Sequence, residues 1–296
     1  MYELIHLKGN SYYIKGHTNM GLYLWGEEDA VLIDSGIDDR SAEGAYAAIE
    51  SLGRRLRLII STHANSDHIG GNRRLIELTG CEVCAQSIER TFMIDQHLNT
   101  SLVWGGYPLP ELFNKFFFAA ETPVTPLEEV TLPSGLEIVS LPGHYVGMIG
   151  IATDDGVLYC ADALSGEELL ARSHITYIHD VGKYLDTVER LSQRRFLWTV
   201  PSHGEPSEDI SALCRANRDN VEEVCRAILS VISDGEASVD ETVARLFAHW
   251  GLRTSPNQYA LVISTLRSYL SYLVGVGRVC YTLADGRLLW RAGGAE

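Results

Sequence analysis

The 296-residue chain contains no apolar run of the roughly 18 residues that a membrane-spanning helix needs. Its first residues, MYELIHLKGNSYYIKGH, show no basic start followed by an apolar stretch, so we expect no export signal and a cytoplasmic protein. Positive charge is also scarce, with 24 Lys and Arg against 39 Asp and Glu and a net charge of −15. Because binding of a polyanion relies on clustered Lys and Arg, this balance argues against nucleic acid as a partner and favours a small molecule.

Cysteine is sparse and shows no disulfide framework. The six cysteines are Cys81, Cys84, Cys160, Cys214, Cys225 and Cys280, and we expect free, buried thiols. Cys81 and Cys84 form a C-x-x-C pair, but CEVCAQ is typical of a short strand, which favours a structural role. The chain also lacks an H-E-x-x-H helix, a P-loop and a G-x-S-x-G turn, so three common hydrolytic mechanisms have no support.

The first half of the chain is rich in strand and turn patterns. Residues 11–36 hold apolar runs broken by turn residues, which predicts antiparallel strands joined by hairpins. A helix is expected over 41–53, with Ser41 as its N-cap, and an apolar strand over 55–62 runs into the segment STHANSDHIGGN. Because that segment follows the carboxyl end of a strand, a rigid sheet holds it in a position typical of chemically active loops.

Two later regions depart from the strand pattern. Residues 87–127 mix helical stretches with many aromatic side chains, and they form either a lid over a substrate or a packed pair of accessory helices. From 207 to 296 the patterns predict three helices, the second with a capping box from Ser238 to Glu241, and then a hairpin turned at Asp285-Gly286. This is the order of a winged helix. We therefore divide the chain into a domain over 1–206 and a smaller helical, winged-helix-like domain over 207–296.

Histidine and aspartate gather in five short segments, each at the end of a predicted strand. The segments contain Asp34 in VLIDSG, His63, Asp67 and His68 in STHANSDHIGGN, His144 in LPGHYVGM, Asp162 in YCADAL and His203 in VPSHGEP. A single histidine is usually structural, but this set places several imidazole and carboxylate groups where strand ends can bring them to one point. Such ligands suit Zn, Mn or Fe(II).

The order and spacing of these segments resemble the metallo-β-lactamase superfamily across about residues 1–206. The pattern of that family is H-x-H-x-D-H, followed by a histidine, an aspartate and a last histidine. The resemblance implies an α+β fold, an αββα sandwich with a metal site at one edge of the two sheets. The small helical domain would follow this sandwich.

The resemblance also implies a role for each matching residue. His63, position 65 and His144 would form one metal site, Asp67, His68 and His203 would form a second, and Asp162 would bridge the two. Asp34 would lie behind the ligands and orient the motif loop. Asp67 would also orient the nucleophile and relay a proton to the leaving group. Tyr145 stands where relatives often carry a small residue or proline, and it would face the substrate.

Position 65 departs from the family pattern, because asparagine stands where a second histidine is expected. The oxygen of an amide is neutral and a poorer donor than imidazole toward borderline metals. We therefore predict two sites of unequal strength, in which the second is tight and the first is weakened by Asn65. Zinc is the expected metal, and the harder donor set of the first site admits Mn(II) or Fe(II) as alternatives.

The expected activity is hydrolysis by a metal-bound hydroxide, since a zinc-type ion lowers the pKa of its water from about 15.7 to about 7. The substrate class that fits the acidic chain is a small ester, thioester, lactone or amide. One alternative is a phosphodiesterase or nuclease of the same fold. Five arginines near the C-terminus would then form a modest basic strip: Arg253, Arg267, Arg278, Arg287 and Arg291.

A second alternative is a protein that binds a metal or a partner without catalysis. The third predicted helix, in SPNQYALVISTLRSYLSYLVGVG and ended by Gly275 and Gly277, is rich in Tyr and Leu. Most of that apolar surface is expected to be core. The remainder would form a homodimer contact or cover the neighbouring active site.

Overall fold

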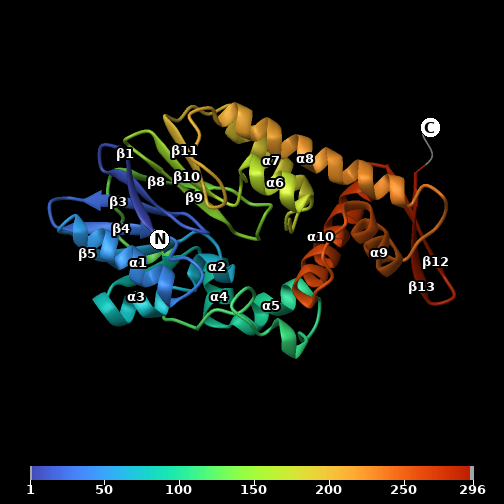
Figure 1. Ribbon diagram of the computed structural model, residues 1–296, viewed down its shortest axis with the longest axis horizontal. Coiled ribbons are helices and arrows are strands. Elements are labelled where there is room, and N and C mark those ends of the chain that lie inside the picture. Colours follow the sequence, from blue (N-terminus) through green and yellow to red (C-terminus); the bar gives the residue numbers. More distant parts are fainter. Residues whose placement is uncertain (1, 294–296) are drawn as a thin grey trace.

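The computed structural model describes residues 2–293, and two β-sheets lie in the half of the molecule drawn on the left of Figure 1. The first sheet has the order β1 (Glu3–Lys8), β2 (Ser11–Lys15), β3 (Met20–Trp25), β4 (Asp29–Ile33), β5 (Arg55–Ser61), β6 (Glu82–Ala85) and β7 (Thr125–Pro126). The second has the order β11 (Trp198–Pro201), β10 (Val157–Ala161), β9 (Ile149–Thr153) and β8 (Leu136–Ser140). Strands β2 to β4 pair antiparallel, as predicted, β1 pairs antiparallel with β2, and β4 to β7 pair in parallel.

The two sheets pack face to face through apolar residues that alternate along their strands. Val31 and Ile33 from the first sheet lie in one buried cluster with Ile149, Ile151 and Tyr159 from the second. Because successive side chains of a strand point to opposite faces, this spacing directs one face of each sheet inward. The alternation seen in the sequence therefore builds the core of the sandwich.

Helices cover the outer faces of both sheets and complete the αββα layers (Figure 1). Helices α1 (Asp39–Ser51) and α3 (Asn72–Thr79) lie on the first sheet, and α7 (Val181–Ser192) lies on the second. The short helix α2 (Ser66–Ile69) holds Asp67 and His68 of the motif segment, and the short helix α6 (Glu167–Ser173) follows the segment that contains Asp162. Helix α1 begins at Asp39 rather than at Ser41. Asp38 is its N-cap, since Asp38 Oδ1 accepts the Ser41 backbone N–H at 3.1 Å.

Residues 87–127 form α4 (Ser87–Ile94), α5 (Gln96–Trp104), the 3₁₀ helix η1 (Pro110–Leu112) and strand β7; a second 3₁₀ helix, η2 (Leu127–Glu129), follows. Val103, Leu112 and Phe117 of this segment make a small core with Ala260 of helix α10 (Pro256–Gly275). The segment is thus packed as a wall between the sandwich and α10. Movement of this wall as a lid stays a prediction.

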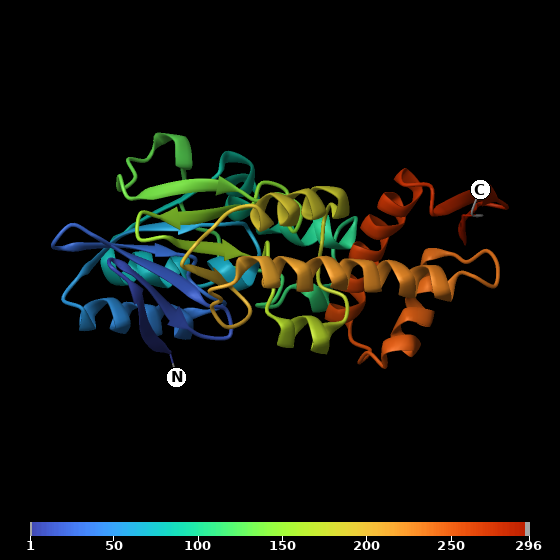
Figure 2. The same ribbon diagram turned by 90° about the horizontal axis from the view of Figure 1, so that it is seen from above.

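The C-terminal region contains α8 (Ile210–Val231), α9 (Val239–Trp250), α10 and the hairpin β12 (Val279–Ala284) with β13 (Arg287–Ala292). The three helices and the hairpin follow in the predicted order, and Ser238 with Glu241 forms the predicted capping box of α9. Helix α8 runs from the sandwich toward the far end of the molecule (Figure 2). Within residues 2–293 no helix is long and apolar enough to span a membrane.

The C-terminal helices pack closely on the sandwich. Tyr184 of α7 donates a hydrogen bond to Asn217 of α8 at 2.9 Å, and both side chains are buried. The apolar residues of α10 serve mainly as core, because Leu266, Tyr269 and Leu270 are buried. The winged-helix assignment and a homodimer through this region remain predictions.

Candidate metal centre

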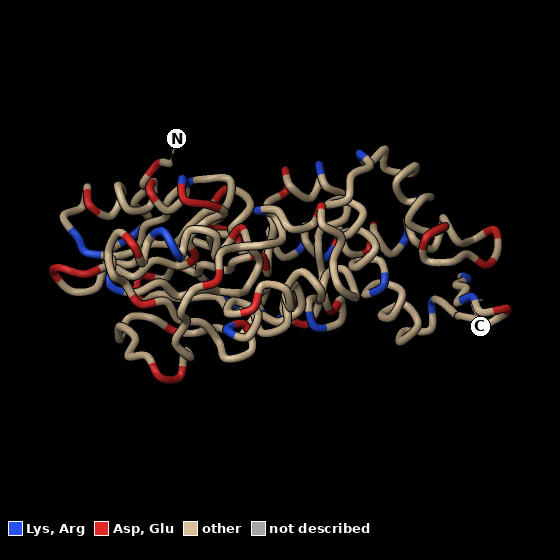
Figure 3. The backbone as a smooth tube through the Cα atoms, turned by 90° about the horizontal axis from the view of Figure 1, so that it is seen from below, with Lys and Arg blue, Asp and Glu red and all other residues tan. Residues whose placement is uncertain are grey.

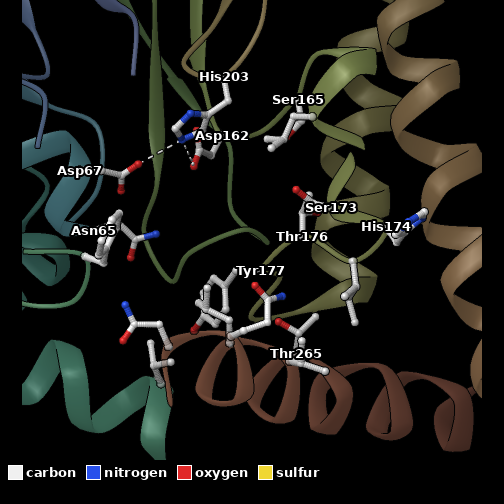
Figure 4. A pocket seen from close by; sticks show the side chains of 18 of the residues that line it. Asn65, Asp67, Asp162, Ser165, Ser173, His174, Thr176, Tyr177, His203 and Thr265 are labelled. Carbon is white, nitrogen blue, oxygen red and sulfur yellow. Dashed lines mark ion pairs between the residues drawn. The ribbon is translucent and has the colours of Figure 1, made fainter. Parts of the chain in front are cut away.

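The predicted ligand residues meet at one edge of the two sheets. Figure 4 shows Asn65, Asp67, Asp162 and His203 among them. Asp34 follows β4, the segment STHANSDHIGGN follows β5, Asp162 follows β10 and His203 follows β11, while His144 lies in the turn between β8 and β9. The strand ends therefore position side chains that are far apart in the sequence. Five of the six cysteines are buried, Cys280 is exposed, and none lies in this group.

Two clusters of donor atoms form at this edge. One consists of His63, His144 and Asp162, and the other consists of Asp67, His68 and His203; within each cluster the donor atoms lie within 4.8 Å of one another. Asp162 lies between the clusters. Its Oδ2 is 3.4 Å from Nε2 of both His68 and His144, and 3.7 Å from Nε2 of His203. This position suits a carboxylate that bridges two ions.

In three of these imidazoles Nδ1 contacts another protein atom, so that Nε2 faces the centre. His68 Nδ1 is 2.8 Å from Asp34 Oδ2, His63 Nδ1 is 3.0 Å from Thr62 Oγ1, and His203 Nδ1 is 3.2 Å from the carbonyl oxygen of His17. Such contacts fix the orientation of a ligating imidazole.

Three buried polar atoms at the centre fit a cation. His63 Nε2, His68 Nε2 and Asp162 Oδ1 have no hydrogen-bond partner within residues 2–293. Buried polar atoms are normally paired, because an unpaired one costs about 1–3 kcal/mol. A divalent metal accepts both imidazole nitrogen and carboxylate oxygen, so it would satisfy all three atoms.

Asp34 lies behind the two donor clusters, in contact with Thr62 and His68. Its two oxygens accept hydrogen bonds from the Thr62 backbone N–H at 2.7 Å and from Thr62 Oγ1 at 2.8 Å, in addition to the contact with His68. The backbone of Asp34 has φ 63°, a value that non-glycine residues rarely adopt. Strain of this kind persists where surrounding contacts fix a functional geometry.

Burial and neighbouring charges shift the donor pKa values in opposite directions. Burial lowers the pKa of His63. Burial also works against protonation of His68 and His203, but the carboxylates of Asp162 and Asp67 outweigh it and raise the pKa of His203 to about 9. Despite burial, the same imidazoles hold the pKa of both carboxyls below the usual range. The cluster therefore carries negative charge that a divalent cation can balance in place of protons.

Asn65 lies at the first cluster with its side chain directed at His144. Asn65 Nδ2 is 3.1 Å from His144 Nε2, and the side chain makes no cap bond to α2. In this orientation the Asn65 amide nitrogen lies at the Nε2 lone pair of His144, which a metal would need. A half-turn of the amide would place Oδ1 in the same position, where it can serve as an oxygen ligand.

Tyr145 does not face the cavity, and the prediction of a substrate contact is wrong. Its side chain is fully buried and its hydroxyl donates a hydrogen bond to Asn99 Oδ1 of α5. The ring packs edge-on against Phe92 at 5.7 Å. Packing against the 87–127 segment decides this orientation, and the residues adjacent to His144 give no sign of it.

Glu89 of α4 is a site residue that the sequence does not reveal. Its carboxylate accepts the backbone N–H of Ala64 at 2.9 Å and that of Gly147 at 2.6 Å. The first lies next to His63 and the second lies in the turn that carries His144. Glu89 thus ties together the two loops of the first cluster. In the sequence it looks like any polar residue of a surface helix.

Glu89→Gln should change how stability depends on pH. Burial raises the pKa of Glu89 to about 7 although two N–H donors oppose the shift. A carboxyl whose pKa is higher in the folded than in the unfolded protein stabilises the fold at low pH. The full contribution is present below the pKa of the unfolded state, near 4.5, and it is lost as pH rises through the folded pKa of about 7. We expect the unfolding free energy of the wild type, relative to the variant, to fall by up to about 3 kcal/mol between pH 4.5 and 8.

Urea unfolding at several pH values measures this difference, in which the other titrating groups cancel. The exposed Glu111 provides the control, and Glu111→Gln should leave the pH profile of the wild type unchanged. Parallel profiles of the wild type and Glu89→Gln would contradict a buried, titrating Glu89.

A cavity of about 670 Å³ opens beside the donor clusters (Figure 4). Asn65, Asp67, His144, Asp162 and His203 line it on one side, and residues of α5, α6, α10 and the α9–α10 loop line the rest. Tyr177 and Tyr184 are the tyrosines that line this cavity, and the ring of Tyr177 lies 5.6 Å from that of His144. The segment of Tyr177, SHITYIHD, shows no pattern that would have singled it out.

Close backbone contact holds the Asp162 and His203 loops together. The Gly166 N–H donates to the carbonyl oxygen of His203 at 2.7 Å. A Cβ atom on Gly204, which has φ 145°, would lie 2.7 Å from the Cα of Gly166. Only glycine fits such an approach, so both loops depend on this pair.

Comparison with known proteins supports this fold and a metal centre in it. The Metallo-beta-lactamase superfamily model matches residues 11–203. Hydroxyacylglutathione hydrolase of Methylobacillus flagellatus is 27% identical over 133 residues, which are 44% of this chain and 42% of that protein. Hydroxyacylglutathione hydrolase GloC of Haemophilus influenzae is 27% identical over 143 residues, 48% of this chain and 64% of that protein. The chain thus spans less than two thirds of each of these relatives.

Solved structures share the fold over nearly the full length. A beta-lactamase domain protein from Burkholderia ambifaria has a TM-score of 0.74 at 16% identity, covering 98% of this chain and 94% of that one. A metallo-beta-lactamase family protein from Thermus thermophilus has a TM-score of 0.70 at 18% identity, covering 98% of both chains. With the family model matching well over half of its length, the chain belongs to the metallo-beta-lactamase superfamily.

Proposed function

We propose that the protein is a metal-dependent hydrolase of a small acyl substrate, with a thioester first and esters, lactones and amides as the wider class. The observation that carries this proposal is the meeting of two donor clusters at Asp162, directly beside a cavity of about 670 Å³. The name of the relatives, hydroxyacylglutathione hydrolase, supports a thioester.

Zinc is the metal we propose first, with Mn(II) or Fe(II) as alternatives. One ion would be held by His63, His144, Asp162 and the amide oxygen of Asn65, and the other by Asp67, His68, His203 and Asp162. Such an ion supplies Lewis acidity when bound, lowering the pKa of water from about 15.7 to about 7.

The protein's own groups would position the reactants. Asp67 is the most exposed carboxylate of the two clusters, at 24% against 10% for Asp162. Its Oδ2 lies 3.1 Å from His203 Nε2 and 3.3 Å from Thr18 Oγ1. We assign Asp67 the orientation of the attacking water and the transfer of its proton to the leaving group. Asp34 would keep the His68 ring in place through its 2.8 Å contact.

Charge argues against the phosphodiesterase or nuclease alternative. Lys and Arg are interspersed with Asp and Glu over the molecule (Figure 3). Two arginines of the supposed basic strip are ion-paired, Arg278 with Glu222 at 3.2 Å and Arg287 with Glu241 at 3.1 Å. Neutralised arginines contribute little to the binding of a phosphate backbone.

A substrate panel combined with metal analysis tests the proposal. We expect kcat/KM to be highest for a thioester among matched p-nitrophenyl ester, thioester, lactone and phosphodiester substrates. Activity should disappear with a strong chelator and return with zinc. A preference for the phosphodiester would favour the nuclease alternative, and metal binding without any turnover would favour a non-enzymatic protein.

A further inference from the structure

We infer that the cavity selects acyl substrates that carry an anionic group, which Arg172 and Arg253 bind at the end away from the metal centre. The inference rests on the proposed function, and it names the substrate class by chemistry: an apolar thioester with a carboxylate or phosphate. It comes from the distribution of charge and apolar surface around the cavity.

The cavity separates negative and positive charge. The carboxylates that line it are Asp67 and Asp162, which belong to the metal centre, and its cationic side chains are those of Arg172 and Arg253. Both arginines are exposed at the rim of the cavity, and neither forms an ion pair with a carboxylate within residues 2–293. In a chain of net charge −15, two arginines without acidic partners beside one cavity make a local site for an anion.

The two arginines belong to segments that meet away from the donor clusters. Arg172 lies near the end of α6, and Arg253 lies in the loop between α9 and α10. The rings of His174 and Trp250, which are close neighbours of the two arginines in sequence, stack in parallel at 5.9 Å. Figure 4 places His174 on the opposite side of the cavity from Asp67. The positive end of the cavity is therefore separated from the reacting centre.

The wall between the two ends is suited to an apolar chain. Val103, Phe117 and Leu261 contribute apolar surface. Tyr177 and Thr265 also line the cavity, but their hydroxyl oxygens are buried and have no hydrogen-bond partner within residues 2–293. The surface that would meet a bound substrate between the two ends is therefore mainly apolar.

Binding of hydrolysis-resistant thioethers tests the inference without turnover. The probes are S-butyl-3-mercaptopropanoate, its neutral primary amide, and S-butyl-2-mercaptoethyl phosphate, measured by calorimetry on the metal-loaded protein. The wild type should bind an anionic probe at least about 10-fold more tightly than the amide, because charge-assisted hydrogen bonds to arginine are strong. The carboxylate and phosphate probes show which anion the site prefers.

The double variant Arg172→Gln/Arg253→Gln should lose this preference while its affinity for the amide is unchanged, which also shows that the cavity is intact. Arg215→Gln removes an exposed charge of α8 outside the cavity and should behave as the wild type. The measurements are repeated after chelation, because an anion can also bind the metals. Equal affinities of the wild type for the amide and the anionic probes would overturn the inference. A preference for anionic probes that persists in the double variant but is lost when the metal is removed would also overturn it.

The same data separate this inference from the proposed function. An absence of ester, thioester, lactone and amide hydrolysis would refute the hydrolase proposal alone, since the thioethers report binding only. Hydrolysis of thioesters with no preference for anionic ones would leave the hydrolase in place and refute the role of the two arginines.

Discussion

Asp162→Asn is expected to abolish hydrolysis and to remove at least one metal ion per chain. The Oδ2 atom of Asp162 lies 3.4 Å from Nε2 of both His68 and His144, so one carboxylate serves both donor clusters. An amide has the same shape but no charge, and it would leave the buried imidazoles without their shared counter-charge. Changes behind a metal ligand cost about 10- to 100-fold in affinity or activity, and a change at a bridging ligand should exceed that range.

Elemental analysis and kcat/KM on one preparation test this expectation. Circular dichroism establishes that the variant is folded. Asp219→Asn is the matched control, because Asp219 is an exposed residue of α8 away from the centre, and it should keep full metal content and activity. An Asp162→Asn protein with wild-type metal content and turnover would show that Asp162 is not a bridging ligand.

Asn65→His is expected to convert an uneven metal centre into an even one. The wild type should keep about one metal ion per chain after dialysis against a weak chelator, because the first cluster has an amide as its additional donor. Its amide nitrogen lies 3.1 Å from His144 Nε2, so the amide must also turn before it can bind a cation. Imidazole is a better donor toward zinc, and it should raise the affinity of the first site by at least about 10-fold.

Metal content after dialysis, followed over a series of chelator concentrations, measures this change. Asn65→Leu is a control of similar size without a donor, and it should bind less of the second equivalent than the wild type. Retention of two full equivalents by the wild type would contradict a weakened site. Identical retention by Asn65→Leu and the wild type would mean that the amide is not a ligand.

Much of the fold could be predicted from local patterns. Alternation of apolar residues predicts the strands, and the hairpin turns at Gly156 and at Asp285-Gly286 follow from residues that tolerate a positive φ. The capping box at Ser238 was likewise visible in the sequence. The N-cap of α1 was misplaced because Asp38, Asp39 and Ser41 are all able to cap a helix, and only the backbone geometry selects among them.

The ligand segments could be predicted because donor type and strand-end position are local properties. Residue type and order alone predicted which histidines and aspartates meet at the metal centre. They also revealed that Asn65 stands where the family pattern has a histidine. The common centre of these residues follows from strand order, which brings the carboxyl ends of β4, β5, β10 and β11 to one edge.

Contacts between distant segments decided the rest. Tyr145 turns into the protein because Asn99 and Phe92 receive it, and Glu89 serves the centre because α4 packs against two loops that are 25 and 58 residues away in sequence. The cavity exists because α10 and the α9–α10 loop close over the sandwich. Such choices depend on the packing of side chains that are remote in the sequence, and no local pattern of residues encodes that packing.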